Sequence, residues 1–114
     1  MASVVICEDD GFLAADLALS IVAAGHRVHG IYKSAAEVLA DPNARAVDVA
    51  IVDLNLADGD SGTLVAQALQ RAGVRVIIVS GHSNADAALG SVPHTYAEKP
   101  VSPALVQELL AIGR

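Results

Sequence analysis

The most informative stretch of this chain is Val47-Asp48-Val49-Ala50-Ile51-Val52-Asp53-Leu54-Asn55, which is apolar up to Val52 except for Asp48. An apolar, β-branched run of this length is typical of a strand buried on both faces, as in a parallel sheet. Turn-forming residues follow from Asp58 to Gly62. Asp53 is therefore expected at the carboxyl end of a buried strand, where open α/β sheets bind ligands. A single aspartate there can also be a simple turn residue, and the rest of the chain decides between these interpretations.

The rest of the chain repeats a strand-helix unit. Further strands are predicted over residues 4–7, 28–32, 74–79 and 94–97. Helices are predicted from residue 12 to 25, over 35–39, from 61 to 73, over 83–89 and from 103 to 112. Regular alternation of this kind gives a parallel sheet with helices on both faces. Five strands in an open, doubly wound sheet suggest a flavodoxin-like (βα)5 three-layer sandwich of strand order 2-1-3-4-5.

Local signals mark the helix starts and the buried faces. Asp10 is expected to cap the first helix rather than to bind metal, and Ser34 and Glu37 have the spacing of a capping box. Asp60 or Ser61 is expected to cap the helix that follows the central strand. The predicted buried faces consist of Leu13, Leu17 and Ile21, then of Leu64, Ala68 and Ala72 with Val65 and Leu69 beside them, and finally of Leu105, Leu109 and Ile112.

Composition restricts the class of protein. A chain of 114 residues with 54% apolar residues is expected to form a single globular domain over 1–114, with no output domain. Without an apolar run of about 18 residues or a signal peptide, no membrane association is expected. A net charge of −6 with only seven Lys and Arg argues against nucleic-acid binding. The single Cys7 is consistent with a core position and a cytoplasmic location.

Polar residues follow four of the predicted strands at the point where each strand ends. They are Glu8-Asp9-Asp10, Asp53, Ser80 and Lys99. The carboxyl ends of parallel strands lie at one edge of a sheet, so these side chains are expected to converge. Clustered carboxylates repel one another, and a divalent cation such as Mg²⁺ removes that repulsion. An aspartate beside such a metal can attack phosphorus, with a lysine and a hydroxyl to stabilise the phosphoryl oxygens.

The whole chain resembles the receiver domain of two-component response regulators. The resemblance is carried by Cys7-Glu8-Asp9-Asp10, Asp53-Leu54-Asn55-Leu56, Ser80-Gly81 and Glu98-Lys99-Pro100, each at a strand end. It implies that the chain is a signalling module of a phosphorelay and not an enzyme in the usual sense. It also implies a histidine kinase or a histidine phosphotransfer protein as phosphodonor, and a downstream protein that the sequence leaves unknown.

The resemblance assigns a role to each matching residue. Asp53 matches the phosphoacceptor, and Asp9 and Glu8 match the acidic pair that binds Mg²⁺, Glu8 through water. Asn55 is implied to offer its backbone carbonyl to the metal. Further roles fall to Ser80, the hydroxyl that moves toward the phosphoryl group, to Lys99, the lysine that is followed by a cis peptide bond, and to Tyr96, the aromatic switch. Ser80 as an ordinary strand-end hydroxyl and Tyr96 as a core aromatic remain open alternatives.

The chain departs from the usual receiver in two places. The segment from Ser80 to Lys99 is about one helical turn short, which implies a truncated or displaced fourth helix, as in small single-domain receivers. The turn from Asp58 to Gly62 is about one residue longer than is common.

Two rival functions use the same residues differently. A small phosphohydrolase of the haloacid-dehalogenase type would use Asp53 as nucleophile, but its motif requires a second aspartate where this chain has Asn55. A pseudo-receiver that is never phosphorylated would be an interaction module. The presence of Asp9, Asp53 and Lys99 argues against the pseudo-receiver.

Overall fold

The computed structural model describes residues 1–81 and 93–111. They contain a five-stranded parallel sheet of order β2-β1-β3-β4-β5, which confirms the predicted flavodoxin-like order. The strands are β1 (Ser3–Cys7), β2 (Arg27–Tyr32), β3 (Val49–Asp53), β4 (Arg75–Ser80) and β5 (Thr95–Glu98). The helices are α1 (Gly11–Ala23), α2 (Ala35–Leu39), α3 (Gly62–Arg71), α5 (Pro103–Ala111) and the 3-10 helix η1 (Pro42–Ala46). The helix predicted over 83–89 lies outside the described residues.

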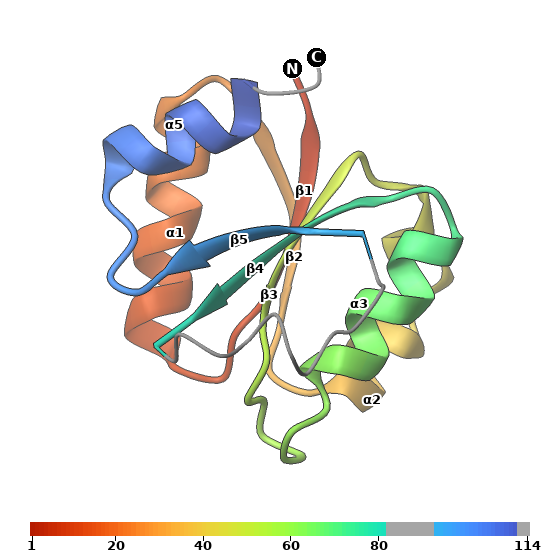
Figure 1. Ribbon diagram of the computed structural model, residues 1–114. Helices are drawn as coiled ribbons and strands as arrows, with labels where there is room; N and C mark the ends of the chain where they lie inside the picture. The colour runs from red at the N-terminus through yellow and green to blue at the C-terminus, as the bar shows by residue number, and fades with distance from the viewer. Residues whose placement is uncertain (82–92, 112–114) are drawn as a thin grey trace.

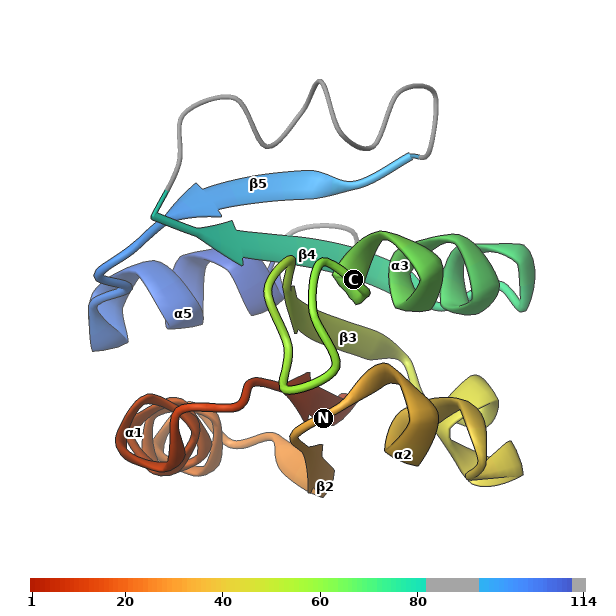
Figure 2. The ribbon, with the colours of Figure 1, turned by 90° about the horizontal axis from the view of Figure 1, so that it is seen from below.

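The sheet is the middle of three layers. Helices α1 and α5 cover one face and α2 and α3 cover the other (Figure 1, Figure 2). Successive strand residues point to opposite faces, so each inner strand contributes to two cores. The core beside α2 and α3 takes Val5 and Cys7 of β1 and Ala50 and Val52 of β3. The core beside α1 and α5 takes Val4, Ile6, Val49 and Ile51. All residues of β3 are buried, as the apolar run predicted.

The predicted caps of α1 and α2 are confirmed. The Asp10 carboxylate accepts hydrogen bonds from the amides of Phe12 and Leu13, at 2.9 and 3.2 Å, and so caps α1. Ser34 and Glu37 form a reciprocal capping box at the start of α2. Both caps join residues that lie only a few positions apart in the sequence, which is why the sequence alone revealed them.

The predicted side-chain cap of α3 is wrong, and its predicted buried face is only partly correct. Ser61 occupies the cap position, but its side chain makes no capping hydrogen bond and donates to Asp58 instead. Leu64 is 59% exposed, whereas Val65 and Leu69 are buried. Two neighbouring faces of this helix each carry apolar residues at intervals of four. The face that is buried is the one that also contains Gly62. A Cβ atom on Gly62 would lie 2.2 Å from the carbonyl oxygen of Asp53. Only a glycine allows the start of α3 to pack against the end of β3.

The predicted faces of α1 and α5 are largely correct. Leu17, Ile21 and Leu109 are buried, whereas Leu13 is 37% exposed at the margin of its helix. Leu105 is half-buried and packs at the edge of its core. Ile112 lies outside the described residues.

A β-bulge in β2 creates a feature that the sequence did not predict. The register with β1 shifts between Val4 and Val5, and the extra residue brings His29 and Tyr32 toward the same acceptor. The hydroxyl of Tyr32 donates to Asp41 Oδ2 at 2.5 Å, and Nε2 of His29 lies 3.3 Å from the same atom. The amide of Asn43 donates to the other oxygen of Asp41 at 3.0 Å, at the start of η1. These four residues are called the Asp41 cluster below.

Candidate functional site

Three carboxylates meet where β1 and β3 end. Oxygen atoms of Glu8, Asp9 and Asp53 all lie within 4.8 Å of one another. The cause is the topology, because β1 and β3 are neighbours with Cys7 paired to Val52. Glu8 and Asp53 are 2% and 7% exposed, whereas Asp9 is open to solvent. The cluster therefore has a buried base and an accessible rim.

Lys99 joins two of these carboxylates from the other side of the sheet edge. Its Nζ atom lies 2.7 Å from Asp53 Oδ2 and 2.8 Å from Glu8 Oε1. Lys99 directly follows β5, and its backbone amide donates to the Ser80 carbonyl at 2.9 Å. The Lys99–Pro100 peptide bond is cis. The polar residues that follow β1, β3 and β5 thus do converge at one edge.

The charges at this edge do not balance. Burial raises the pKa of Glu8, and this effect outweighs the hydrogen bonds from Lys99 and from the Asp10 amide that lower it. Burial alone would lower the pKa of Lys99, but its hydrogen bonds to Asp53 and Glu8 raise it overall. The edge contains three carboxylates, and Lys99 contacts two of them. The resulting excess of negative charge favours binding of a cation.

The composition of this cluster fits Mg²⁺. Mg²⁺ prefers carboxylate and carbonyl oxygens and commonly takes one or two carboxylates from a protein. Asp9 and Asp53 supply carboxylate oxygens close together, and the chain turns after Asp53 so that Asn55 is exposed at the rim. The acidic pocket of Glu8, Asp9 and Asp53 is thus consistent with a metal-assisted phosphoacceptor site.

Both oxygens of Asp53 are held by the protein. Lys99 binds Oδ2, and the backbone amide of Asn55 donates to Oδ1 at 3.1 Å. The carboxylate is therefore oriented by two residues from different strand ends, which favours a single side-chain position.

Ser80 and Tyr96 are brought to the same region. Ser80 is the last residue of β4 and is 1% exposed. Tyr96 on β5 is half-buried against the core beside α2 and α3, and its hydroxyl lies 3.5 Å from the Ser80 carbonyl oxygen. The two side chains predicted to act together thus lie on the adjacent strands β4 and β5, next to β3, which ends at Asp53.

Sequence reasoning missed one residue that shapes this site. Asp58 appeared only as a turn former, yet its carboxylate accepts hydrogen bonds from the amides of Ala35 and Ala36 in α2. These partners lie 23 and 22 positions away in the chain. No local pattern signals such a contact, because it depends on how the loop after β3 folds against α2.

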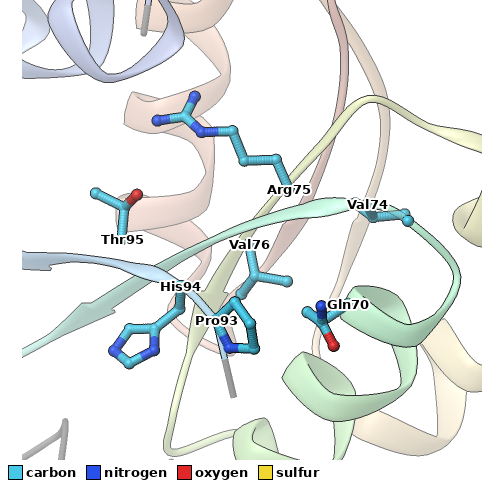
Figure 3. A pocket seen from close by; sticks show the side chains of 8 residues that line it. Gln70, Val74, Arg75, Val76, Pro93, His94 and Thr95 are labelled. Atoms are coloured by element: carbon cyan, nitrogen blue, oxygen red, sulfur yellow. The ribbon is translucent and has the colours of Figure 1, made fainter. Parts of the chain in front are cut away.

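A pocket lies at the opposite, amino-terminal edge of the sheet, remote from the acidic cluster. It has a volume of about 320 Å³ and is lined by residues of α3, β4 and the start of β5, including Gln70, Val76 and His94 (Figure 3). The side chain of Arg75 extends away from Gln70 and Val76 in this view, and its guanidinium donates to the Leu109 carbonyl at 2.6 Å.

Among the described residues, no helix is long and apolar enough to cross a bilayer.

Comparison with known families agrees with this site. The profile of the response regulator receiver domain matches residues 4–111. The chain therefore belongs to the response regulator receiver family. Members of this family are signalling modules rather than conventional enzymes, and they interact with histidine kinases. No curated protein matches the sequence significantly.

Solved receiver structures share the fold. The signal receiver domain of a modulated diguanylate cyclase from Desulfovibrio desulfuricans G20 is 24% identical, with a TM-score of 0.85 over 98% of this chain and 92% of that chain. A CheY-like receiver domain from Methylobacillus flagellatus is 23% identical, with a TM-score of 0.83 over 97% of both chains. The response regulator PhyR from Brucella abortus is 27% identical, with a TM-score of 0.80 over 96% of this chain but only 46% of that chain.

Proposed function

We propose that this domain is a phosphoacceptor receiver of a two-component phosphorelay, and that Asp53 is the acceptor. The observation that carries the proposal is the buried Asp53 carboxylate, which Lys99 and the Asn55 amide hold beside Glu8 and Asp9. Such a carboxylate is oriented for attack and lies where positive charge can stabilise a phosphoryl group.

The geometry of the edge supports the following transfer. An oxygen of Asp53 attacks the phosphorus of a phosphohistidine on a histidine kinase or a histidine phosphotransfer protein. A phosphorus–oxygen bond forms, the phosphorus–nitrogen bond breaks, and the imidazole of the donor takes up a proton. Lys99 exchanges its contact with the Asp53 carboxylate for one with a phosphoryl oxygen, as positioned cations do in phosphoryl transfer.

Asp9, Asp53 and the backbone carbonyl of Asn55 are the groups that would hold Mg²⁺, with Glu8 acting through water. When bound, Mg²⁺ neutralises charge on the phosphoryl oxygens and on the crowded carboxylates. The Ser80 hydroxyl then donates a hydrogen bond to a phosphoryl oxygen, and the Tyr96 side chain moves into the space that Ser80 leaves. The resulting change of surface shifts the domain between two partner-binding states, and an unidentified downstream protein reads that change.

A matched pair of variants tests the acceptor. Asp53→Asn and Asp60→Asn each remove one negative charge, but Asp60 is exposed in the loop after β3. With Mg²⁺ and a small phosphodonor, intact-mass spectrometry should find one added phosphoryl group on the wild type and on Asp60→Asn, and none on Asp53→Asn. Equal labelling of the two variants would exclude Asp53 as the acceptor.

A further inference from the structure

The loop between β3 and α3 carries the residue proposed to contribute a backbone oxygen to the metal, and Figure 2 shows this loop at the carboxyl edge of the sheet, extending toward the start of α2. The loop closes on itself, because Leu56 and Gly59 exchange two backbone hydrogen bonds of 2.9 and 3.0 Å. Gly59 has a φ of 100°, a conformation that favours glycine. These contacts shape the turn but do not determine where the turn lies relative to Asp53.

The position of the loop is set by contacts with the segment that follows β2. The amide of Ala57 donates to the Lys33 carbonyl at 2.9 Å. The Asp58 carboxylate accepts from the amides of Ala35 and Ala36, at 3.0 Å to Oδ1 and 3.2 Å to Oδ2. Two successive loop residues, Ala57 and Asp58, are therefore bound to one residue that follows β2 and to the first two residues of α2.

Asp58 is itself held in place. The hydroxyl of Ser61, which is buried, donates to Asp58 Oδ1 at 2.5 Å. This bond and the one from the Ala35 amide lower the pKa of Asp58 to about 2, so the carboxylate stays charged at any physiological pH. The contact accounts for the missing cap of α3, since the Ser61 hydroxyl turns to Asp58 instead of to its own helix.

The backbone amides in the first turn of α2 all find acceptors. Ser34 accepts from the Glu37 amide within the capping box, and Asp58 accepts from the two amides that the box leaves over. A residue from another loop thus completes the start of α2, and the helix in turn holds the loop.

We propose that Asp58 is a positioning residue for the metal site, because it ties the loop that carries Asn55 to the start of α2. This inference rests on the proposed function, in which the Asn55 carbonyl binds the metal. Asp58 touches neither the acceptor nor the metal. It acts through the backbone from Leu56 to Asn55, whose amide also orients Asp53.

The test compares Asp58→Asn with Asp60→Asn. Both variants remove one negative charge from the same loop, but the Asp60 side chain makes no hydrogen bond with the described residues. An asparagine at position 58 would turn an amide group toward backbone donors, so at least one of the two bonds to α2 is lost. Ser61→Ala is the second variant, because it keeps Asp58 and removes only the hydroxyl that holds it.

Mg²⁺ affinity is measured by titration, with the amide resonances of Glu8 and Asn55 as reporters, and phosphorylation is measured with a small phosphodonor. Loss of partners that orient metal ligands typically costs about 10–100-fold in affinity, and for the more distant Asp58 we expect about 3–10-fold. Ser61→Ala should lose less, and Asp60→Asn should match the wild type. Urea unfolding of each variant separates this effect from a loss of stability, because a merely structural role would lower the midpoint without changing the affinity of the folded protein.

The possible outcomes separate this inference from the function on which it rests. Equal Mg²⁺ affinity of Asp58→Asn and Asp60→Asn would overturn the inference and leave the phosphoacceptor intact. A wild type that binds Mg²⁺ but takes up no phosphoryl group would overturn the proposed function, while the affinity comparison would still decide the role of Asp58.

Discussion

The carboxyl edge of the sheet and the Asp41 cluster both bring carboxylates together with other polar side chains, but they resolve the charge in opposite ways. Asp41 is one carboxylate among several hydrogen-bond donors, and these hydrogen bonds, chiefly that from Tyr32, lower its pKa. Glu8 is a buried carboxylate beside two others, and burial raises its pKa despite the contact with Lys99. A carboxylate whose oxygens all accept hydrogen bonds stabilises the fold, whereas a surplus of carboxylates leaves an edge that a cation can stabilise.

The largest expected effect comes from removing the only cation found among the described residues of the edge. Lys99→Met leaves Glu8 and Asp53 buried and close together without a positive charge. We expect the free energy of unfolding to fall by about 2 kcal/mol at neutral pH, since breaking a buried ion pair strands its partners. Urea unfolding measures the loss. Lys33→Met, which removes an exposed lysine, serves as the control and should have little effect.

The loss in Lys99→Met should also depend on pH, because protonation of a carboxylate relieves the repulsion. The same measurement at about pH 5 should show a smaller loss than at about pH 7. An equal loss at both values would mean that Lys99 stabilises the domain by packing rather than by charge.

An intermediate effect is expected at Glu8. Its folded pKa lies above the ordinary value of 4.5, so the folded state binds more protons than the unfolded state over the interval between the two values. The stability contributed by this group is therefore highest below pH 4.5 and falls as the pH rises through the folded pKa. Glu8→Gln should remove this dependence and raise the free energy of unfolding at neutral pH. Metal-free unfolding over a pH series tests this, and a variant that retains the wild-type slope would contradict it.

The smallest effect is expected in the Asp41 cluster. Its contribution to stability depends on pH in the opposite direction to that of Glu8. Because the pKa of Asp41 is lowered from 3.8, its contribution is present above that value and is lost as the pH falls through the folded pKa. Tyr32→Phe removes the hydrogen bond that lowers the pKa of Asp41 the most. We expect the midpoint of thermal unfolding to fall by a few degrees at neutral pH, and the further loss on acidification to become smaller. Phosphorylation of Asp53 should keep its wild-type rate, and a slower rate would show that the two regions are coupled.

Local sequence patterns predicted the parts of the molecule that depend on neighbours in the chain. The alternation of apolar runs and helical segments predicted the parallel sheet, and the capping box of Ser34 and Glu37 was visible because its members are three residues apart. The acidic cluster was predictable too, since parallel strands must end at one edge. The resemblance to receivers supplied the roles of its members, which stay proposals until Asp53 is tested.

Contacts between distant segments were not predictable. The choice between the two apolar rows of α3 depended on Gly62 packing against the end of β3. The Asp41 cluster depended on a bulge that brings His29 and Tyr32 to one side of β2. In each case the local sequence pattern was compatible with more than one arrangement, and tertiary packing selected one.

The sequence by itself therefore predicted that Asp53 ends a buried central strand, because an apolar, β-branched run of this length is typical of a strand covered on both faces. Only the tertiary structure decided how Asp53 is held, with Lys99 on one oxygen and the Asn55 amide on the other. It alone placed Asp58 against α2. The physical reason is the range of the interactions: burial of a strand is encoded in consecutive residues, whereas hydrogen bonds and ion pairs across the edge join groups that only the folded chain brings together.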